Sequence, residues 1–187
     1  MNKKVPICLS VANRIIVRTN ALNEWRYQRG LEQVKLTGKR LQKILYLCQL
    51  FWYIDHEECN MISENFYAWG TGPVIPQIYE FFPIYHDGIT LHPLRNLEKY
   101  TLNEEEIDLI NKVVDNTIDI DTETIIDYIQ LTDVPWINIY NKYGIGKGVI
   151  SKDSIKKYIR REEVQTEWLD FIQNRISYEE LVLTKKN

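Results

Sequence analysis

Hydrophobic residues recur every three to four positions along most of this chain, which is the period of an α-helix with one buried face. The clearest stripe runs from Lys39 to Ile54, and the Thr37 hydroxyl is placed to cap its first turn. Its apolar members are Leu41, Ile44, Leu45, Leu47, Cys48, Phe51 and Ile54. A face this wide predicts a helix at the centre of the fold.

Shorter periodic runs predict further helices. One is expected over 10–20, and 20–36 is expected to continue as a second helix or helical linker broken near Gly30. Others are expected over 77–82, 122–131 and 153–161, the last capped by Ser151, and after capping boxes at Thr101–Glu104 and Ser177–Glu180. Strands are expected only in 83–99, where Asp87-Gly88 signals a turn. The pattern therefore predicts a mainly α, compact single-domain helical fold with at most a short β-hairpin around 83–99.

The composition is that of a globular protein rather than a disordered or secreted one. The chain has 187 residues, of which 44% are hydrophobic and 26% charged. The longest apolar run near the start, Val5 to Val11, is too short for a membrane span or a signal segment. The three cysteines are an odd number without a CxxC pair, which argues against a disulfide framework. A cytoplasmic protein with no membrane association is expected.

Charge is segregated along the chain although the total is only -3. Residues 1–50 hold ten bases and two acids, 101–135 hold ten acids and one base, and 136–161 hold seven bases and one acid. These blocks either attract one another within the fold or mark surfaces for charged partners.

Candidate chemistry is sparse. His56, His86 and His92 do not supply a convergent set of zinc ligands, and Cys48 falls on the apolar stripe of the central helix. There is no G-x-S-x-G nucleophile motif, and the carboxylates of 104–127 have the spacing of solvated helix faces. We therefore expect no enzyme activity, no metal and no cofactor.

Two segments invite a nucleic-acid or phosphate interpretation. Gly144–Gly148 lacks the spacing of a phosphate-binding loop, so a flexible turn is favoured there. The basic region 14–43, with Trp25 and Tyr27 among its arginines and lysines, could bind phosphates, or its charges could be solvated or paired within the fold. A nucleic-acid partner is possible but not favoured.

Two contiguous motifs are specific: residues 41–49, LQKILYLCQ, and residues 67–79, YAWGTGPVIPQIY. They resemble the LQKLLYFAQ helix and the E-A-W-x-x-G-P-V-x-P-x-V-Y element of the Panacea domain of SocA-like antitoxins and GepA-like phage-associated proteins. A V-A-n-y-I-I opening at 11–16 and a P-W…I-s-x-e-x-I-x-x-Y-f ending at 135–158 are supportive. The motif residues, which we read as mainly structural, are Leu41, Lys43, Tyr46, Trp69, Gly72, Pro73, Val74, Pro76, Tyr79, Pro135 and Trp136. Trp69 and Trp136 are interpreted as core anchors, with an exposed interface hot spot as the alternative.

The sequence also departs from the family pattern. Arg14 and Tyr67 stand where the motifs have an aromatic and an acid, and Thr132-Asp133 stands where a histidine is common. The resemblance implies a Panacea-like domain over 1–161, followed by a C-terminal helical extension over 162–187 that packs on it or binds a partner.

The resemblance further implies a proteic antitoxin that neutralises a cognate toxin by direct binding. Alternatives are a phage- or mobile-element-encoded regulator or counter-defence protein that binds another host factor, including an adaptor for proteolysis, and a nucleic-acid binder. A homo-oligomer is also possible. The partner-binding candidates, chosen from the charged blocks, are Glu104, Glu105, Glu106, Asp108, Arg26 and Arg29. The acids among them could imitate phosphates towards a toxin that acts on nucleic acid.

Overall fold

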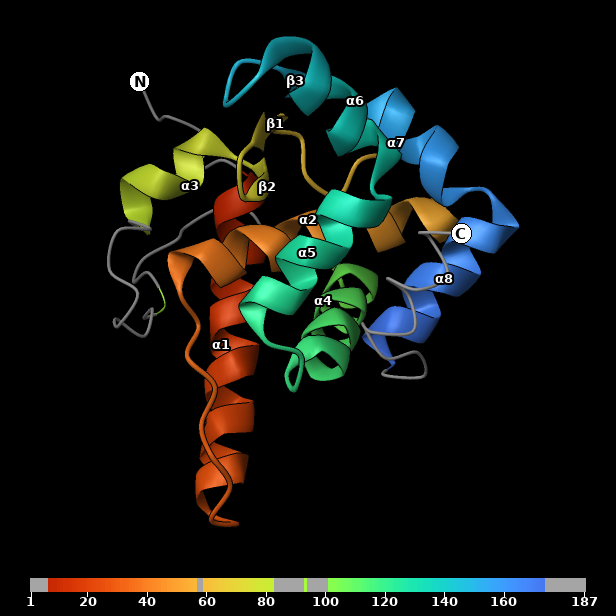
Figure 1. The fold of residues 1–187 in the computed structure, drawn as a ribbon. Helices are drawn as coiled ribbons and strands as arrows, with labels where there is room; N and C mark the ends of the chain where they lie inside the picture. The colour runs from red at the N-terminus through yellow and green to blue at the C-terminus, as the bar shows by residue number, and fades with distance from the viewer. Residues whose placement is uncertain (1–6, 57–58, 83–92, 94–100, 174–187) are drawn as a thin grey trace.

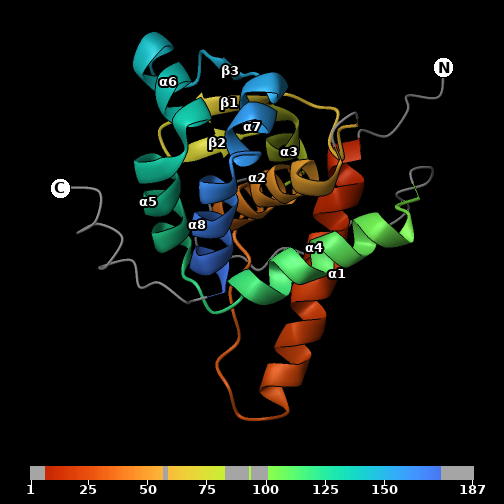
Figure 2. The ribbon, with the colours of Figure 1, turned by 90° about the vertical axis from the view of Figure 1, so that its right-hand side faces the viewer.

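Helix α2 (Gly38–Asp55) is the centre of the fold, and all its residues from Arg40 to Tyr53 are buried in the computed structural model. The structure describes residues 7–56, 59–82, 93 and 101–173. Helices α1, α4, α5 and α7 and strand β2 pack against α2. Figures 1 and 2 show these elements surrounding it on all sides. A helix enclosed in this way is buried around its whole circumference, which explains why its apolar stripe is so wide.

Helix α1 (Ile7–Tyr27) is longer than predicted at both ends. After a turn at Gly30, which has a φ of +67°, residues 31–36 return alongside the helix in extended form. The Asn23 side chain holds this return segment. Its Nδ2 donates to Val34 O at 2.8 Å, and its Oδ1 accepts from Val34 N at 2.8 Å. The expectation of helix over 20–36 is therefore correct up to Tyr27 and wrong beyond the turn.

Three short strands form one antiparallel sheet in the order β2-β1-β3. They are β1 (Phe66–Trp69), β2 (Gly72–Val74) and β3 (Val149–Ile150). Trp69 pairs with Gly72 across a tight hairpin, and Phe66 pairs with Ile150 from a distant part of the chain. The restriction of strands to 83–99 was wrong, because these strands are too short to show an alternating pattern. The hairpin predicted at Asp87-Gly88 lies outside the described residues.

The other described helices follow in chain order. They are α3 (Pro76–Phe81), α4 (Glu104–Thr117), α5 (Thr122–Thr132), α6 (Val134–Tyr143), α7 (Lys152–Ile159) and α8 (Glu162–Ile172). The sequence pattern predicted α3, α4, α5 and α7 and missed α6. The capping box at Ser177–Glu180 lies outside the described residues.

Helix starts agree with the predicted caps in two of three testable cases. The Thr37 and Ser151 side chains accept from the amides of α2 and α7 as predicted. At α4, however, the cap is Asn103, and Glu106 completes the capping box with it. The box predicted at Thr101 was therefore displaced by two residues, since Asn103 is an equally good acceptor closer to the apolar run.

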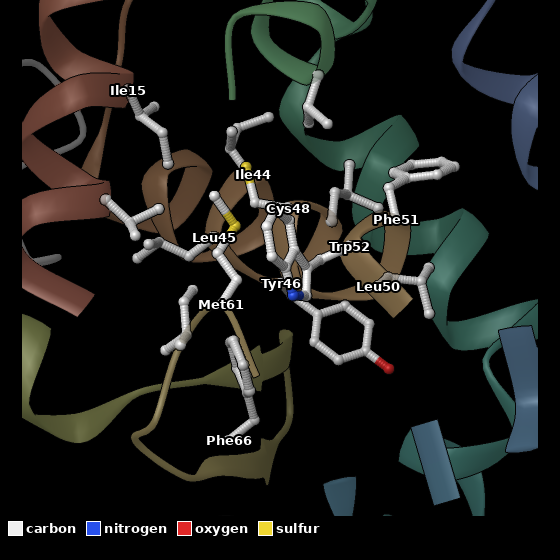
Figure 3. Packing of buried hydrophobic residues seen from close by; sticks show 14 of the residues in the cluster. Ile15, Ile44, Leu45, Tyr46, Cys48, Leu50, Phe51, Trp52, Met61 and Phe66 are labelled. Carbon is white, nitrogen blue, oxygen red and sulfur yellow. The ribbon is translucent and has the colours of Figure 1, made fainter. Parts of the chain in front are cut away.

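One hydrophobic core joins these elements. Figure 3 shows α1, α2 and the segment around β1 meeting through Ile15, Leu45, Met61 and Phe66. Trp168 and Phe171 of α8 belong to the same core. The mainly α fold is confirmed. Among the described residues, no helix is both long and apolar enough to cross a membrane.

Candidate interaction site

Two polar side chains of α2 bind the backbone of the β1–β2 hairpin and of the residue after it. Lys43 Nζ donates to Pro73 O at 2.9 Å, and the Gln42 amide exchanges two hydrogen bonds with the backbone of Ile75, at 2.9 and 3.1 Å. A Cβ on Gly72 would lie 3.0 Å from Lys43 Nζ, and its φ of +96° also favours glycine. The Gly72-Pro73 pair is therefore required for the close approach of the hairpin to α2.

The Lys43 amine is fully buried, and burial lowers its pKa to about 7, with a smaller contribution from Lys39 in the same direction. Desolvation disfavours the charged ammonium, while a neutral amine can still donate to the Pro73 carbonyl. Lys43 thus connects α2 to the β1–β2 hairpin inside the fold, and it is not available to a phosphate or to a partner.

A second buried group joins α2 to the α5–α6 junction. Tyr46 Oη donates to Asp133 Oδ2 at 2.5 Å, and Asp133 Oδ1 accepts from Trp136 N at 2.8 Å, which caps α6. Burial raises the pKa of Asp133 to about 6, although both hydrogen bonds oppose this shift. The Thr132-Asp133 departure from the family pattern therefore has a structural role here. Asp133 links two helices in the core.

The motif aromatics differ in exposure. Trp136 is buried and donates from Nε1 to Trp69 O at 3.0 Å, as expected of a core anchor. Trp69 is only partly buried, and its ring stacks on Tyr79 with 5.0 Å between centroids. Leu41, Val74 and Pro135 are buried, and Pro76 begins α3. The motif residues thus build a scaffold, and Trp69, Pro76 and Tyr79 are the members that are partly exposed.

The N-terminal bases are bonded largely within the fold. Arg18 makes a bidentate contact to Asp115 at 2.5 and 2.7 Å, Arg26 lies 2.7 Å from Asp119, and Lys39 lies 3.0 Å from Glu123. Arg40 is buried and donates to Thr117 O and Ile120 O at 2.6 and 2.7 Å, where α4 ends. Three ion pairs therefore join the first basic block to the acidic block, from α1 and α2 to α4, the turn after it and α5.

The predicted charged contact residues are brought to different places. Glu106 is buried in the α4 capping box, and Glu105 Oε1 lies 3.0 Å from His56 Nε2. Glu104 and Asp108 are exposed on the same helix.

The two arginine candidates also differ. Arg26 is held by Asp119 and by Glu32 O, whereas exposed Arg29 lies over the Trp25 ring, 4.1 Å from its centroid. The six candidates do not form one surface.

Exposed apolar side chains form two groups at opposite ends of the molecule, and Val17, Phe81, Leu131 and Val134 are exposed at other positions. Trp25, Tyr27 and Leu31 lie at the far end of α1, which projects from the body in Figures 1 and 2. At the opposite end, where α6 and β3 lie, Tyr143, Ile145 and Val149 are exposed. The sequence analysis missed the second group. The available signal in the sequence was Ile145, a single isoleucine between two glycines of a loop, where no helical or strand pattern would bury it.

Among the described residues, no group of three or more His, Cys, Asp or Glu side chains is placed so that it could hold a metal ion. His56 Nδ1 lies 3.1 Å from Trp52 O, and its ring stacks on Trp52. Exposed Cys59 is a free thiol. His86 and His92 lie outside the described residues.

The comparisons with known proteins return one family. The family model described as "Antitoxin SocA-like, Panacea domain" matches residues 41–137, which extend from α2 into the first turn of α6. No curated protein and no solved structure matches the chain.

Proposed function

Because the chain belongs to the family of SocA-like antitoxins with a Panacea domain, we propose that it is a proteic antitoxin that neutralises a cognate toxin by direct binding. The observation that carries this proposal is the match over residues 41–137, which contains both motifs that form the scaffold around α2. We propose further that it acts in the cytoplasm and performs no chemistry of its own.

The arrangement of the motif residues supports a binding role. Lys43, Tyr46 and Asp133 are buried and bonded to the protein itself, so they are not presented to a substrate. The accessible groups are instead aromatic and aliphatic side chains at the two ends of the molecule. Exposed Trp and Tyr side chains with arginine beside them are typical of energetically important positions at protein interfaces.

The internal pairing of the first basic block disfavours the nucleic-acid alternative. Binding to a phosphate backbone needs accessible cations, whereas Arg18, Arg26 and Arg40 donate to groups of the same chain. An antitoxin and a regulator of another host factor both need a protein-binding surface, so these two functions are separated by the identity of the partner.

Co-expression with the product of the neighbouring gene tests the proposal. The neighbour is induced alone, with this chain, and with a chain whose core is disrupted by Tyr46→Ala. We expect growth arrest by the neighbour alone, rescue by the intact chain, and co-purification of the two proteins. The Tyr46→Ala chain should fail in both respects. A neighbour that is harmless and does not bind would contradict the antitoxin function.

A further inference from the structure

The segment Gly144–Gly148 is not a flexible turn, because three backbone hydrogen bonds hold it against the scaffold. Gly144 N donates to Tyr140 O at 2.9 Å, Gly146 N donates to Ala68 O at 3.0 Å, and Ala68 N donates to Gly148 O at 2.9 Å. A Cβ on Gly148 would lie 2.2 Å from Ile139 Cγ2. The glycines therefore allow the loop to lie tightly between α6 and β1.

This tight loop leaves Ile145 facing solvent. Ile145 is 70% exposed, the highest value among the large hydrophobic residues that the structure describes, and exposed Tyr143 and Val149 flank it in the sequence. Lys142 Nζ lies 4.8 Å from the centroid of the Tyr143 ring, and Lys147 is also exposed. We name these five residues, Lys142, Tyr143, Ile145, Lys147 and Val149, the glycine-loop patch.

The charge of the patch indicates what would cover it. In contrast to the bases of α1, Lys142 and Lys147 have no carboxylate within 4 Å in the described part of the chain. Two lysines around an exposed aliphatic centre are complementary to an acidic rim around an apolar pocket.

We propose that the glycine-loop patch is the surface by which this chain binds its partner protein, and that the partner presents an apolar pocket for Ile145 with acidic side chains around it. The inference rests on the proposed function for the existence of such a partner. Aliphatic Ile145 and Val149 favour a protein over a nucleic acid, because a phosphate backbone offers them no apolar surface. The bracing of the loop reduces the ordering cost of binding.

The test measures the affinity of purified variants for the partner captured by co-expression. Ile145→Asp should weaken binding by about tenfold or more, as expected for a central hydrophobic contact. The double variant Lys142→Gln, Lys147→Gln should slow association and reduce its dependence on salt. The matched control is Leu131→Asp, which places the same charge on an exposed aliphatic residue in the last turn of α5, outside the patch, and it should bind like the wild type.

Other outcomes would overturn the inference without affecting the proposed function. They are unchanged binding by Ile145→Asp, an equal loss in Leu131→Asp, and self-association of the free chain that Ile145→Asp abolishes, which would make a second copy the occupant. Binding of a single-stranded RNA probe that depends on Lys142 and Lys147 would also overturn it. A wild-type chain that captures no partner contradicts the proposed function itself. Equal thermal midpoints for all variants exclude a folding defect.

Discussion

Two basic segments of this chain have the same sign of charge but opposite relations to the rest of the fold. The segment on α1 and α2 lies against α4, so that Arg18 and Arg26 meet carboxylates and Arg40 is buried at the end of that helix. In the segment on α6 and the loop after it, Lys142 and Lys147 have no carboxylate within 4 Å among the described residues and remain at the surface. Net charge along a sequence therefore does not locate a binding surface. The candidate binding surface consists of the charged groups that the fold does not pair internally.

The largest expected effect is at Arg40. Arg40→Met removes the donors to Thr117 O and Ile120 O and leaves buried carbonyl groups unpaired, so the free energy of unfolding should fall by about 3 kcal/mol. Urea denaturation measures this change. Lys142→Met, in the other basic segment, should leave the denaturation midpoint unchanged. Equal midpoints for the two variants would contradict the distinction between the segments.

The acidic block also contains both buried and exposed groups, namely buried Asp133 and exposed Asp108. The pH dependence of stability tests this difference at Asp133. Because the folded-state pKa of about 6 exceeds the ordinary value of 3.8, the folded chain retains a proton that the unfolded chain loses. Stability from this group is fully present below about pH 4 and is lost as the pH rises through 6, and the loss between pH 4 and pH 6 should be about 2 kcal/mol.

Asp133→Asn should abolish that loss while retaining the cap of α6, because asparagine is also a good N-cap. The measurement is the free energy of unfolding between pH 4 and 6. Exposed Asp108→Asn is the control and should leave the wild-type slope intact. A slope that persists in Asp133→Asn would place its origin elsewhere.

Lys43 gives the corresponding test for a buried base. Its folded-state pKa is about 7 instead of 10.5, so the unfolded chain binds more protons between these values and stability rises with pH through this window. From pH 7 to 8.5 the gain should be about 1.5 kcal/mol, and Lys43→Met should remove it. Lys147→Met should show the wild-type pH dependence, and a matching loss of slope in both variants would refute the assignment to Lys43.

A smaller effect is expected at the partly exposed pair of Arg18 and Asp115. A double-mutant cycle with alanine at both positions should give a coupling of about 0.5 kcal/mol that declines with added salt. Coupling that is independent of salt would indicate a contribution from packing rather than charge.

The smallest effect on stability is expected for the double variant Lys142→Gln, Lys147→Gln, whose thermal midpoint should equal that of the wild type. Both side chains are exposed and have no carboxylate partner among the described residues, so the variant loses only the exposed contact of Lys142 with the Tyr143 ring. Differential scanning fluorimetry checks this, and a lowered midpoint would show that the lysines stabilise the fold.

The sequence by itself determined the central helix, most of the other helices and the family. These features depend on local spacing: the apolar stripe of α2, the caps at Thr37 and Ser151, and the contiguous motifs of 41–49 and 67–79. Local spacing was insufficient for α6, for the return segment after Gly30, and for the strands, which are fixed by contacts to distant residues such as Ile150.

Only the tertiary structure decided which charged groups are accessible. Lys43 and Lys142 are the same residue type in two basic segments, and the sequence gives no sign that one is fully buried and the other exposed. Likewise Glu104 and Glu106 are two positions apart, yet one is exposed and the other is buried in a capping box. The physical reason is that pairing and burial depend on which helices lie side by side, and the packing of α1 on α4 joins residues about a hundred positions apart.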